Sequence, residues 1–238
     1  MGKAVRLDKF LADSGAGTRT EVKKLIQKGM VQVNGETAKK PELKVDPERD
    51  VVEFGGERLG ARAEFVYYLL HKPAGYVSAT EDIREKTVLE LVPKDGRRNL
   101  FPVGRLDKDT EGLLLITNDG ELAHRLLSPK KHVDKVYYAK VQGKVDESDV
   151  KAFADGVDIG DDTPAKSADL RILKSGEESE IELTITEGRF HQVKRMFHAV
   201  GKEVIYLKRL SMGSLALDKT LTKGEYRSLT EEEIKKLC

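Results

Sequence analysis

The sequence predicts an α+β protein in two parts. A small helix-and-hairpin domain is expected over residues 1–59, and a larger domain over residues 60–238, with a mixed, largely antiparallel β-sheet flanked by helices. The length of 238 residues exceeds the roughly 150 that a typical domain uses. An Asn-Gly turn follows two amphipathic helices near the N-terminus. Farther along, strand-like segments do not alternate regularly with helices, which disfavours a doubly wound parallel sheet.

Two amphipathic helices begin the first part. Leu7, Phe10 and Leu11 share one helical face, which predicts a helix that buries this face. The spacing Thr18-x-x-Glu21 is typical of a capping box, so a second helix is expected to begin here. Its polar side carries four cations, which are Arg19, Lys23, Lys24 and Lys28.

A hairpin and a short strand follow these helices. Gly29 is expected to end the second helix, and residues 31–36 (VQVNGE) contain an Asn-Gly pair that readily adopts the positive φ angles of a tight turn. Residues 51–54 (VVEF) form the next expected strand. The glycine-rich residues 55–60 form an expected hinge to the second part.

The second part contains the segments expected to form its sheet. Residues 65–70 and 113–116 are short apolar runs, typical of buried strands, and residues 136–145 suit a further strand. Residues 180–186 alternate apolar and polar side chains, which predicts a strand with one wet face. Helices are expected at three places, which are residues 121–127, residues 189–200 closed by Gly201, and a short final helix capped by Thr230.

Composition excludes several classes of protein. The only cysteine is Cys238 and the five histidines are scattered, so neither a disulfide framework nor a cysteine-ligated zinc site is expected. No apolar run approaches the roughly 18 residues that a membrane span requires, and the N-terminal residues lack the apolar stretch of a signal peptide. We therefore expect a cytoplasmic protein with no bound metal, no membrane association and no obligate protein partner.

The net charge is only +1, but the charges are unevenly spread. Residues 1–30 carry a net charge of +4, residues 123–144 carry +5 and residues 186–210 carry +4, so the rest of the chain is acidic. Basic surfaces on an acidic body suit phosphate binding, because bound Lys and Arg release counterions from nucleic acid. Solvated basic faces without a ligand are the simpler alternative.

The most distinctive segment is residues 103–112 (VGRLDKDTEG), a glycine-flanked loop that leads directly into an apolar run. Asp107 in this loop is open to several roles: nucleophile, general acid or base, metal ligand together with Asp109, or a residue that only hydrogen-bonds the turn. The residue types alone favour the turn. A metal site is weaker still, because Asp107-x-Asp109 lacks the further oxygen ligands that calcium and magnesium loops collect.

Four motifs, in order along the chain, resemble those of the pseudouridine synthases. GRLDKDTEGLLLITNDG at residues 104–120 is similar to the catalytic loop of the family branch that modifies ribosomal RNA. HKPAGYVSAT (71–80), KVYYAKVQG (135–143) and the segment 187–217, which contains RFHQVKRMF, are similar to the other motifs. The last segment resembles the RsuA-type, small-subunit branch. Residues 5–54 resemble the small RNA-binding domain of ribosomal protein S-four.

The resemblance implies a reaction and roles for particular residues. It implies a cofactor-free isomerisation of uridine to pseudouridine in which Asp107 is the catalytic nucleophile. Lys194, at an Arg/Lys position of the family, is implied to keep Asp107 ionised. Tyr137 is implied to stack on the uracil and to bring its hydroxyl near the carbon that loses its proton. Arg105 is implied to hold RNA while the target base flips out of its helix.

The implied substrate is a single uridine of 16S rRNA, uridine 516, in free rRNA or in the assembling small subunit. Three alternatives stay open: a synthase acting on 23S rRNA, a non-catalytic rRNA-binding assembly factor, and a metal-dependent nuclease that uses Asp107 and Asp109. The residues expected to contact RNA are Arg105, Arg19, Lys23, Lys24, Lys28, Arg189, His191, Gln192 and Arg195.

Overall fold

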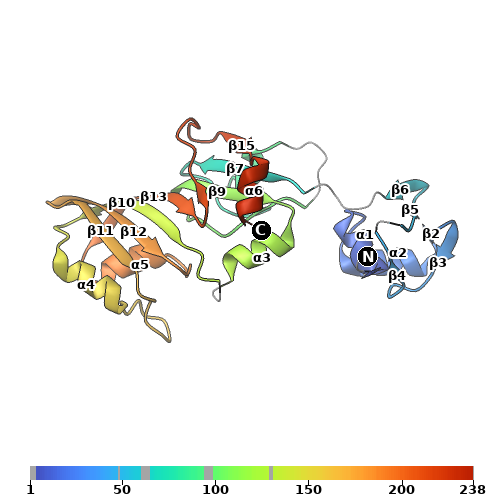
Figure 1. The fold of residues 1–238 in the computed structure, drawn as a ribbon, viewed down its shortest axis with the longest axis horizontal. Helices are drawn as coiled ribbons and strands as arrows, with labels where there is room; N and C mark the ends of the chain where they lie inside the picture. The colour runs from blue at the N-terminus through green and yellow to red at the C-terminus, as the bar shows by residue number, and fades with distance from the viewer. Residues whose placement is uncertain (1–3, 48, 60–64, 94–98, 129–130, 238) are drawn as a thin grey trace. The chain divides into compact units, whose positions relative to one another are not determined.

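The computed structural model describes residues 4–47, 49–59, 65–93, 99–128 and 131–237. Contacts within the chain define two compact units, the first containing the described residues up to Phe65 together with Asn99, and the second containing the other described residues (Figure 1). The expected boundary after residue 59 stays a prediction, because residues 60–64 lie outside the described residues.

The first unit is a small α+β domain. β1 pairs with β4, and β3, β2, β5 and β6 form a four-stranded sheet in that order. Apolar side chains from both helices and from the strands form one core. In chain order the elements are β1 (Val5–Arg6), α1 (Leu7–Asp13), α2 (Arg19–Gln27), β2 (Val31–Val33), β3 (Glu36–Ala38), β4 (Lys44–Val45), β5 (Val52–Phe54) and β6 (Glu57–Leu59).

The predicted local signals of this unit are confirmed, apart from the hinge. Thr18 and Glu21 form the capping box, with the Thr18 backbone N–H donating to Glu21 Oε2 at 2.7 Å. Asn34 takes a φ of 53° in the turn between β2 and β3. The hinge prediction is wrong for Gly55 and Gly56, which form the turn between β5 and β6 with φ angles of 62° and 83°. Positive φ at both central residues suits a tight hairpin, and Gly60 lies outside the described residues.

The second unit is built on one nine-stranded sheet (Figure 1). Within the described residues, no helix combines the length and the apolar character needed to cross a membrane. In chain order the elements are β7 (Tyr67–Lys72), the 3-10 helix η1 (Val88–Leu91), β8 (Phe101–Pro102), β9 (Glu111–Thr117), α3 (Gly120–Leu127), β10 (Lys135–Gln142), α4 (Glu147–Asp155), β11 (Asp169–Lys174), β12 (Glu178–Ile185), α5 (Gln192–Ala199), β13 (Glu203–Met212), β14 (Leu215–Ala216), β15 (Tyr226–Ser228) and α6 (Glu231–Leu237).

The predicted mixed, largely antiparallel sheet is confirmed. The main strand order is β11-β12-β10-β13-β9-β7-β15, with β14 beside β13 and β8 beside β9. Every pair is antiparallel except β9 with β13, which are parallel. Gly112 lies at this parallel contact with a φ of +105°, and a Cβ there would be 2.2 Å from the backbone oxygen of Arg209. The two strands can therefore meet only because residue 112 has no side chain.

β9 lies between two cores, and all seven of its residues are buried. Leu114 and Ile116 belong to the apolar cluster that includes side chains of α4 and α5. Leu113 and Leu115 belong to the cluster that includes side chains of α3 and α6. Because alternate residues of a strand point to opposite faces, both faces of β9 are covered. The strand is thus a rigid support for the loop that precedes it.

α5 begins later than predicted. The helix was expected over residues 189–200, but it starts at Gln192, because His191 has a left-handed backbone with a φ of 48°. Residues 189–191 therefore form a turn ahead of the helix. The expected C-terminal signal is confirmed, since Gly201 takes a φ of 74° after the helix ends.

Candidate active site

The loop of residues 103–110 leads into β9 and carries Asp107. The backbone N–H of Thr110 donates to the carbonyl oxygen of Asp107 at 3.1 Å. On the other side of Asp107, the hydroxyl of Ser78 accepts from the backbone N–H of Leu106 at 3.0 Å and donates to its carbonyl oxygen at 2.8 Å. The backbone is thus fixed both before and after Asp107.

Lys72 holds the same loop through one fully buried ammonium group. Burial lowers the pKa of Lys72 to about 8, although nearby carboxylates act in the opposite direction. The sequence analysis includes this residue in the motif HKPAGYVSAT but gives it no role, although a lysine between an apolar run and a proline was a signal. The backbone carbonyl oxygens that accept from Nζ are those of Pro73 at 3.1 Å, Asp107 at 3.0 Å, Lys108 at 3.3 Å and Thr110 at 2.8 Å.

A cavity of about 470 Å³ lies beside this loop. Three segments meet around it, which are the turn after β7, the loop before β9 and the N-terminal end of α5. Its volume lies within the roughly 300–1,000 Å³ of ordinary small-ligand sites, a range that suits a group of nucleotide size. The lining residues are Ala74, Gly75, Asp107, Lys108, Asp109, His191 and Lys194.

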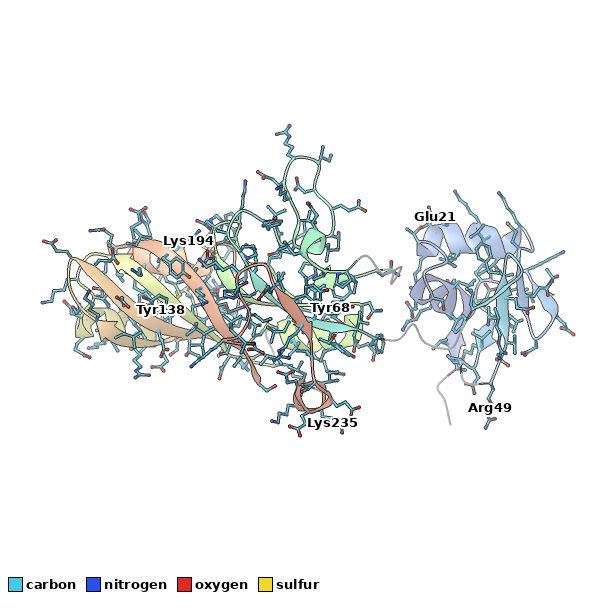
Figure 2. The ribbon with its side chains drawn as sticks, turned by 90° about the horizontal axis from the view of Figure 1, so that it is seen from above. Glu21, Arg49, Tyr68, Tyr138, Lys194 and Lys235 are labelled. Atoms are coloured by element: carbon cyan, nitrogen blue, oxygen red, sulfur yellow. The ribbon has the colours of Figure 1, made fainter. Side chains whose placement is uncertain are left out.

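Asp107 faces a lysine and a histidine across this cavity. Lys194 Nζ lies 3.5 Å from Asp107 Oδ2, and His191 Nε2 lies 3.6 Å from Asp107 Oδ1. Lys194, labelled in Figure 2, is closer to Asp109, with nitrogen–oxygen distances of 2.6 and 2.8 Å. The expected contact of Lys194 with Asp107 is therefore present, but it is not the shortest contact that Lys194 makes.

Asp109 and Asp107 share the charge of Lys194. Partial burial alone would raise the pKa of Asp109, but the hydrogen bonds and the charge of Lys194 outweigh it and lower that pKa below its ordinary value. Among the described residues, no group of three or more His, Cys, Asp and Glu side chains is placed to hold a metal ion. The loop thus pairs its two carboxylates with a lysine from α5.

Tyr137 does not line the cavity. This residue of β10 is 8% exposed and belongs to the same apolar cluster as Leu106 and Val193, which precede Asp107 and Lys194 in the chain. The neighbouring Tyr138, labelled in Figure 2, donates to Glu180 at 2.7 Å instead. The role of Tyr137 against a uracil stays a prediction, and it requires that this ring become accessible.

The other predicted RNA contacts fall into two groups, and the first is exposed. Arg105 is exposed and forms no ion pair with any residue that the structure describes. Arg19, Lys23 and Lys24 of α2 and its C-cap residue Lys28 are also exposed. Lys23 lies 3.9 Å from Asp8, and within the described part of the chain this is the one ion pair made by those four. These side chains are therefore available to a ligand.

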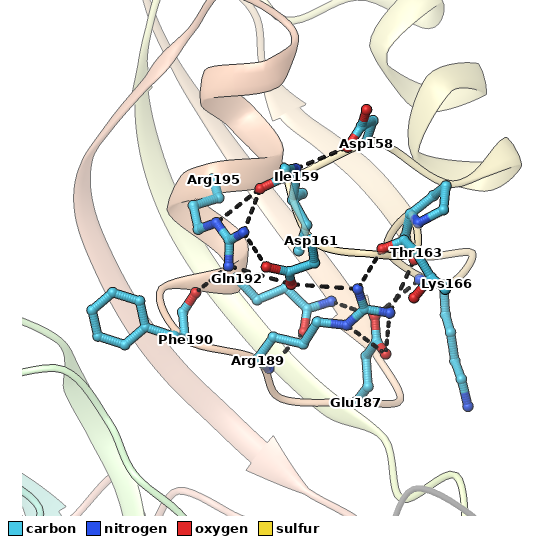
Figure 3. A network of polar contacts seen from close by, with 12 residues as sticks. Asp158, Ile159, Asp161, Thr163, Lys166, Glu187, Arg189, Phe190, Gln192 and Arg195 are labelled. Atoms are coloured by element: carbon cyan, nitrogen blue, oxygen red, sulfur yellow. Dashed lines mark hydrogen bonds and ion pairs between the residues drawn. The ribbon is translucent and has the colours of Figure 1, made fainter.

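Arg195 belongs to the second group, whose donors are used inside the protein (Figure 3). Its Nε donates to the carbonyl oxygen of Ile159 at 3.0 Å, and Nη1 donates to that of Phe190 at 3.1 Å. The guanidinium group also pairs with the carboxylate of Asp161. Arg195 thereby ties α5 to the loop that follows α4.

Arg189 and Gln192 extend the same network (Figure 3). Arg189 donates to the carbonyl oxygens of Thr163 at 2.6 Å and Pro164 at 2.9 Å. Gln192 is buried, and its amide donates to Glu187 at 2.9 Å. These three side chains fix the turn at the start of α5, and the expectation that Arg189, Gln192 and Arg195 contact RNA stays a prediction. His191, on the same turn, does line the cavity.

Comparison with known families accounts for both units. Residues 66–199 match the RNA pseudouridylate synthase family, and residues 5–52 match the S4 domain. The first match contains the loop of Asp107 and the whole of α5, and the second contains α1 and α2. The fold and the site thus define an RNA-modifying isomerase joined to an S4 domain.

Similar proteins cover nearly the whole chain. An uncharacterized RNA pseudouridine synthase of Bacillus subtilis (strain 168) is 51% identical over 97% of this chain and 97% of its own. The ribosomal small subunit pseudouridine synthase A of Escherichia coli (strain K12) is 40% identical, over 97% of this chain and 98% of its own. A crystal structure of a pseudouridylate synthase has a TM-score of 0.71 at 40% identity and covers 98% of this chain and 100% of that one. The chain belongs to the RNA pseudouridine synthase family and is of the RsuA type.

Proposed function

We propose that this enzyme isomerises one uridine of 16S rRNA, uridine 516, with Asp107 as its nucleophile. The relatives named for the small ribosomal subunit support 16S rRNA as the substrate, in free form or in the assembling subunit, and such a substrate implies a cytoplasmic enzyme. One observation carries the role of Asp107. It is the cavity carboxylate that faces both Lys194 and His191, on a loop whose backbone is held by Lys72.

The reaction exchanges one bond to the ribose for another. The glycosidic bond from N1 to C1′ breaks, the uracil turns, and a bond from C5 to C1′ forms. C5 loses a proton and N1 gains one, so the product is an isomer of the substrate and no co-reactant is consumed. The Asp107 carboxylate supplies an electron pair for a transient covalent bond and is released at the end. Attack on the sugar and attack on the base both satisfy this balance.

The surrounding residues have separate tasks in this proposal. Lys194, whose Nζ lies 3.5 Å from Asp107 Oδ2, orients the carboxylate and offsets its charge in the cavity. Arg105 is exposed and close to Asp107 in the chain, so it is suited to hold a phosphate or the RNA helix while the target nucleotide is extruded. The hydroxyl of Tyr137 is the proposed group near C5 when that carbon loses its proton.

Asp107→Asn tests this proposal. The substitution preserves volume but removes the nucleophile, so we expect it to abolish pseudouridine formation while the fold and most of the RNA affinity remain. Carbodiimide mapping of 16S and 23S rRNA would be compared among cells that lack the gene and cells that carry the wild-type or variant gene. Asp155→Asn is the matched control, because it makes the same chemical change at an exposed carboxylate of α4 that does not line the cavity, and it should retain modification.

Each other outcome contradicts a defined part of the proposal. Modification by Asp107→Asn would contradict the role of Asp107. A gene-dependent pseudouridine in 23S rRNA, with 16S rRNA unchanged, would contradict the target. Binding of rRNA by the wild-type protein, without any modification in vivo or by the purified enzyme, would instead support the non-catalytic assembly factor.

A further inference from the structure

We propose that Phe190 is a stacking platform for a base of the substrate RNA next to the target nucleotide. The inference rests on the proposed function, because it assigns a second contact to the same RNA. It concerns the turn between β12 and α5, which the network around Arg195 and Arg189 fixes.

The Phe190 ring is unusually open for a large apolar side chain beside a cavity. It is 74% exposed, and in Figure 3 it projects away from the polar network. One of its faces is covered by the ring of His191, with the ring centroids 3.8 Å apart and the planes 17° from parallel. A flat aromatic surface with one covered face and large exposure suits another planar ring.

The backbone holds this pair of rings in place. Neighbouring side chains do not face each other along a regular helix or strand, so the stack depends on the left-handed backbone of His191, with a φ of 48°. A non-glycine residue in this conformation is strained and persists only where its surroundings enforce it. Here the carbonyl oxygen of Phe190 accepts from Arg195 at 3.1 Å. The side-chain oxygen of Gln192 accepts from the backbone N–H of Arg189 at 2.9 Å, which closes the turn. The ring is thus presented rigidly.

The position of the pair points to RNA as the occupant. His191 lines the cavity and lies 3.6 Å from the nucleophilic carboxylate, while Phe190 stacks on its ring. A nucleotide bound with its ribose near Asp107 brings its chain neighbours to the rim where Phe190 lies. Single-stranded or splayed bases are commonly held by stacking on aromatic side chains. The exposed Arg105 adds positive charge for the phosphates of the same strand.

Photo-crosslinking tests the contact directly. Full-length Asp107→Asn protein, which holds RNA without turnover in the proposed mechanism, would be irradiated with deproteinised total rRNA from cells that lack the gene. We expect a nucleotide adduct on the tryptic peptide of residues 190–194, located at Phe190 by mass spectrometry. The adduct should disappear in the Phe190→Ala form, while adducts elsewhere, including those on the S4 domain, persist as an internal control.

Single-turnover kinetics test what the contact contributes. We expect Phe190→Ala to raise the RNA concentration for half-maximal rate at least about fivefold, because stacking of one base on an aromatic ring typically contributes that much to affinity. Phe190→Leu keeps an apolar side chain but no flat face and should behave like Phe190→Ala, whereas Phe190→Trp should behave like the wild type. Leu173→Ala is the control, since Leu173 is an exposed apolar residue on β11, and it should have no effect.

Failure of this inference is distinguishable from failure of the proposed function. Adducts elsewhere on the protein with none at Phe190, or unchanged kinetics for Phe190→Ala, would overturn the stacking role. If Phe190 instead binds a ribosomal protein, the kinetics of Phe190→Ala should be unchanged, because deproteinised rRNA contains no ribosomal protein. Absence of adducts on every peptide, together with absence of turnover by the wild type, would overturn free rRNA as the substrate and the stacking role with it.

Discussion

α2 and the start of α5 look alike in sequence but use their cations differently. Each has an apolar stripe opposite a basic face. On α2 the cations are exposed, and within the described residues only Lys23 has a carboxylate partner, at 3.9 Å. Around α5, the side chains of Arg189, Lys194 and Arg195 are 23–28% exposed and paired with carboxylates. A basic face in sequence is therefore not by itself a phosphate-binding surface.

The difference lies in the partners, which come from distant segments of the chain. Arg195 meets Asp161 from the loop after α4, and Lys194 meets Asp109 from the loop before β9. Within the described residues, the one carboxylate that pairs with this helix is Asp8 of α1, 3.9 Å from Lys23, so the exposed cations of α2 can exchange water for phosphate. The two regions thus divide the work, with RNA affinity expected from α2 and organisation of the site expected from α5.

Lys194→Met would separate the two regions most strongly. We expect the activation free energy of the single turnover at saturating RNA to rise by about 3 kcal/mol, which lowers the rate roughly 150-fold. This value is the low end of the cost of breaking a buried ion pair. The low end applies because Lys194 and Asp107 are 26% and 23% exposed. Lys23→Met on α2 is the control, and saturating RNA should restore its rate. Equal saturated rates for the wild type and Lys194→Met would show that Lys194 is only a surface lysine.

Replacing two cations of α2 should affect affinity and leave chemistry unchanged. We expect Lys24→Gln/Lys28→Gln to weaken rRNA binding about tenfold at moderate salt, and to make the slope of log affinity against log salt shallower by about 2. The rate at saturating RNA should stay at the wild-type value. Lys235→Gln/Lys236→Gln removes the same charge from α6 and serves as the control. An unchanged salt slope in the α2 variant would mean that these lysines do not touch phosphate.

Raising the pH should weaken the site without weakening the fold. Burial lowers the pKa of Lys72 to about 8. Half a pH unit above that value about a quarter of the Lys72 amines are protonated, so we expect the saturated single-turnover rate to be about fourfold lower than well below the pKa. The neutral amine has one N–H fewer for the loop carbonyls. Stability should follow the opposite sign. An unfolded lysine titrates near 10.5, so between about 8 and 10.5 the unfolded chain binds more protons, and the contribution of Lys72 to the free energy of unfolding rises with pH.

Urea unfolding and single-turnover assays over the same pH series would check this prediction. RNA affinity, measured in parallel, controls for effects of pH on binding. A rate that stays constant through this range, or a rate loss that only tracks loss of stability, would contradict the role of Lys72.

The features that the sequence predicts well are local ones. The capping box of Thr18 and Glu21 and the Asn34-Gly35 turn depend on residues a few positions apart, so their patterns are sufficient. The Asp107 loop was found through its resemblance to a family motif, and the structure places Asp107 in the cavity. Composition alone favoured a simple turn, because Asp and Gly are common in loops of every kind.

The features that the sequence does not predict depend on distant partners. The fixed Arg189 and Arg195 look like free cations until the loop of residues 159–166 is placed beside them. The late start of α5 has a local origin that the helical spacing does not indicate: His191 is left-handed, Arg195 donates to the Phe190 carbonyl oxygen, and Gln192 accepts from the Arg189 backbone N–H. The closer pairing of Lys194 with Asp109 than with Asp107 is likewise a matter of tertiary distances.

Lys72 gives the loop that carries Asp107 a buried cation. Its ammonium group donates to four backbone carbonyl oxygens. An ionophore surrounds a potassium or ammonium ion with a similar shell of oxygen atoms. Because the ammonium group of Lys72 is covalently tethered and fully buried, it cannot be exchanged with the medium. Folded RNA needs salts whose kind and amount vary with conditions, and salt weakens the contacts that proteins make with phosphate. The loop that carries Asp107 keeps its shape independently of that supply.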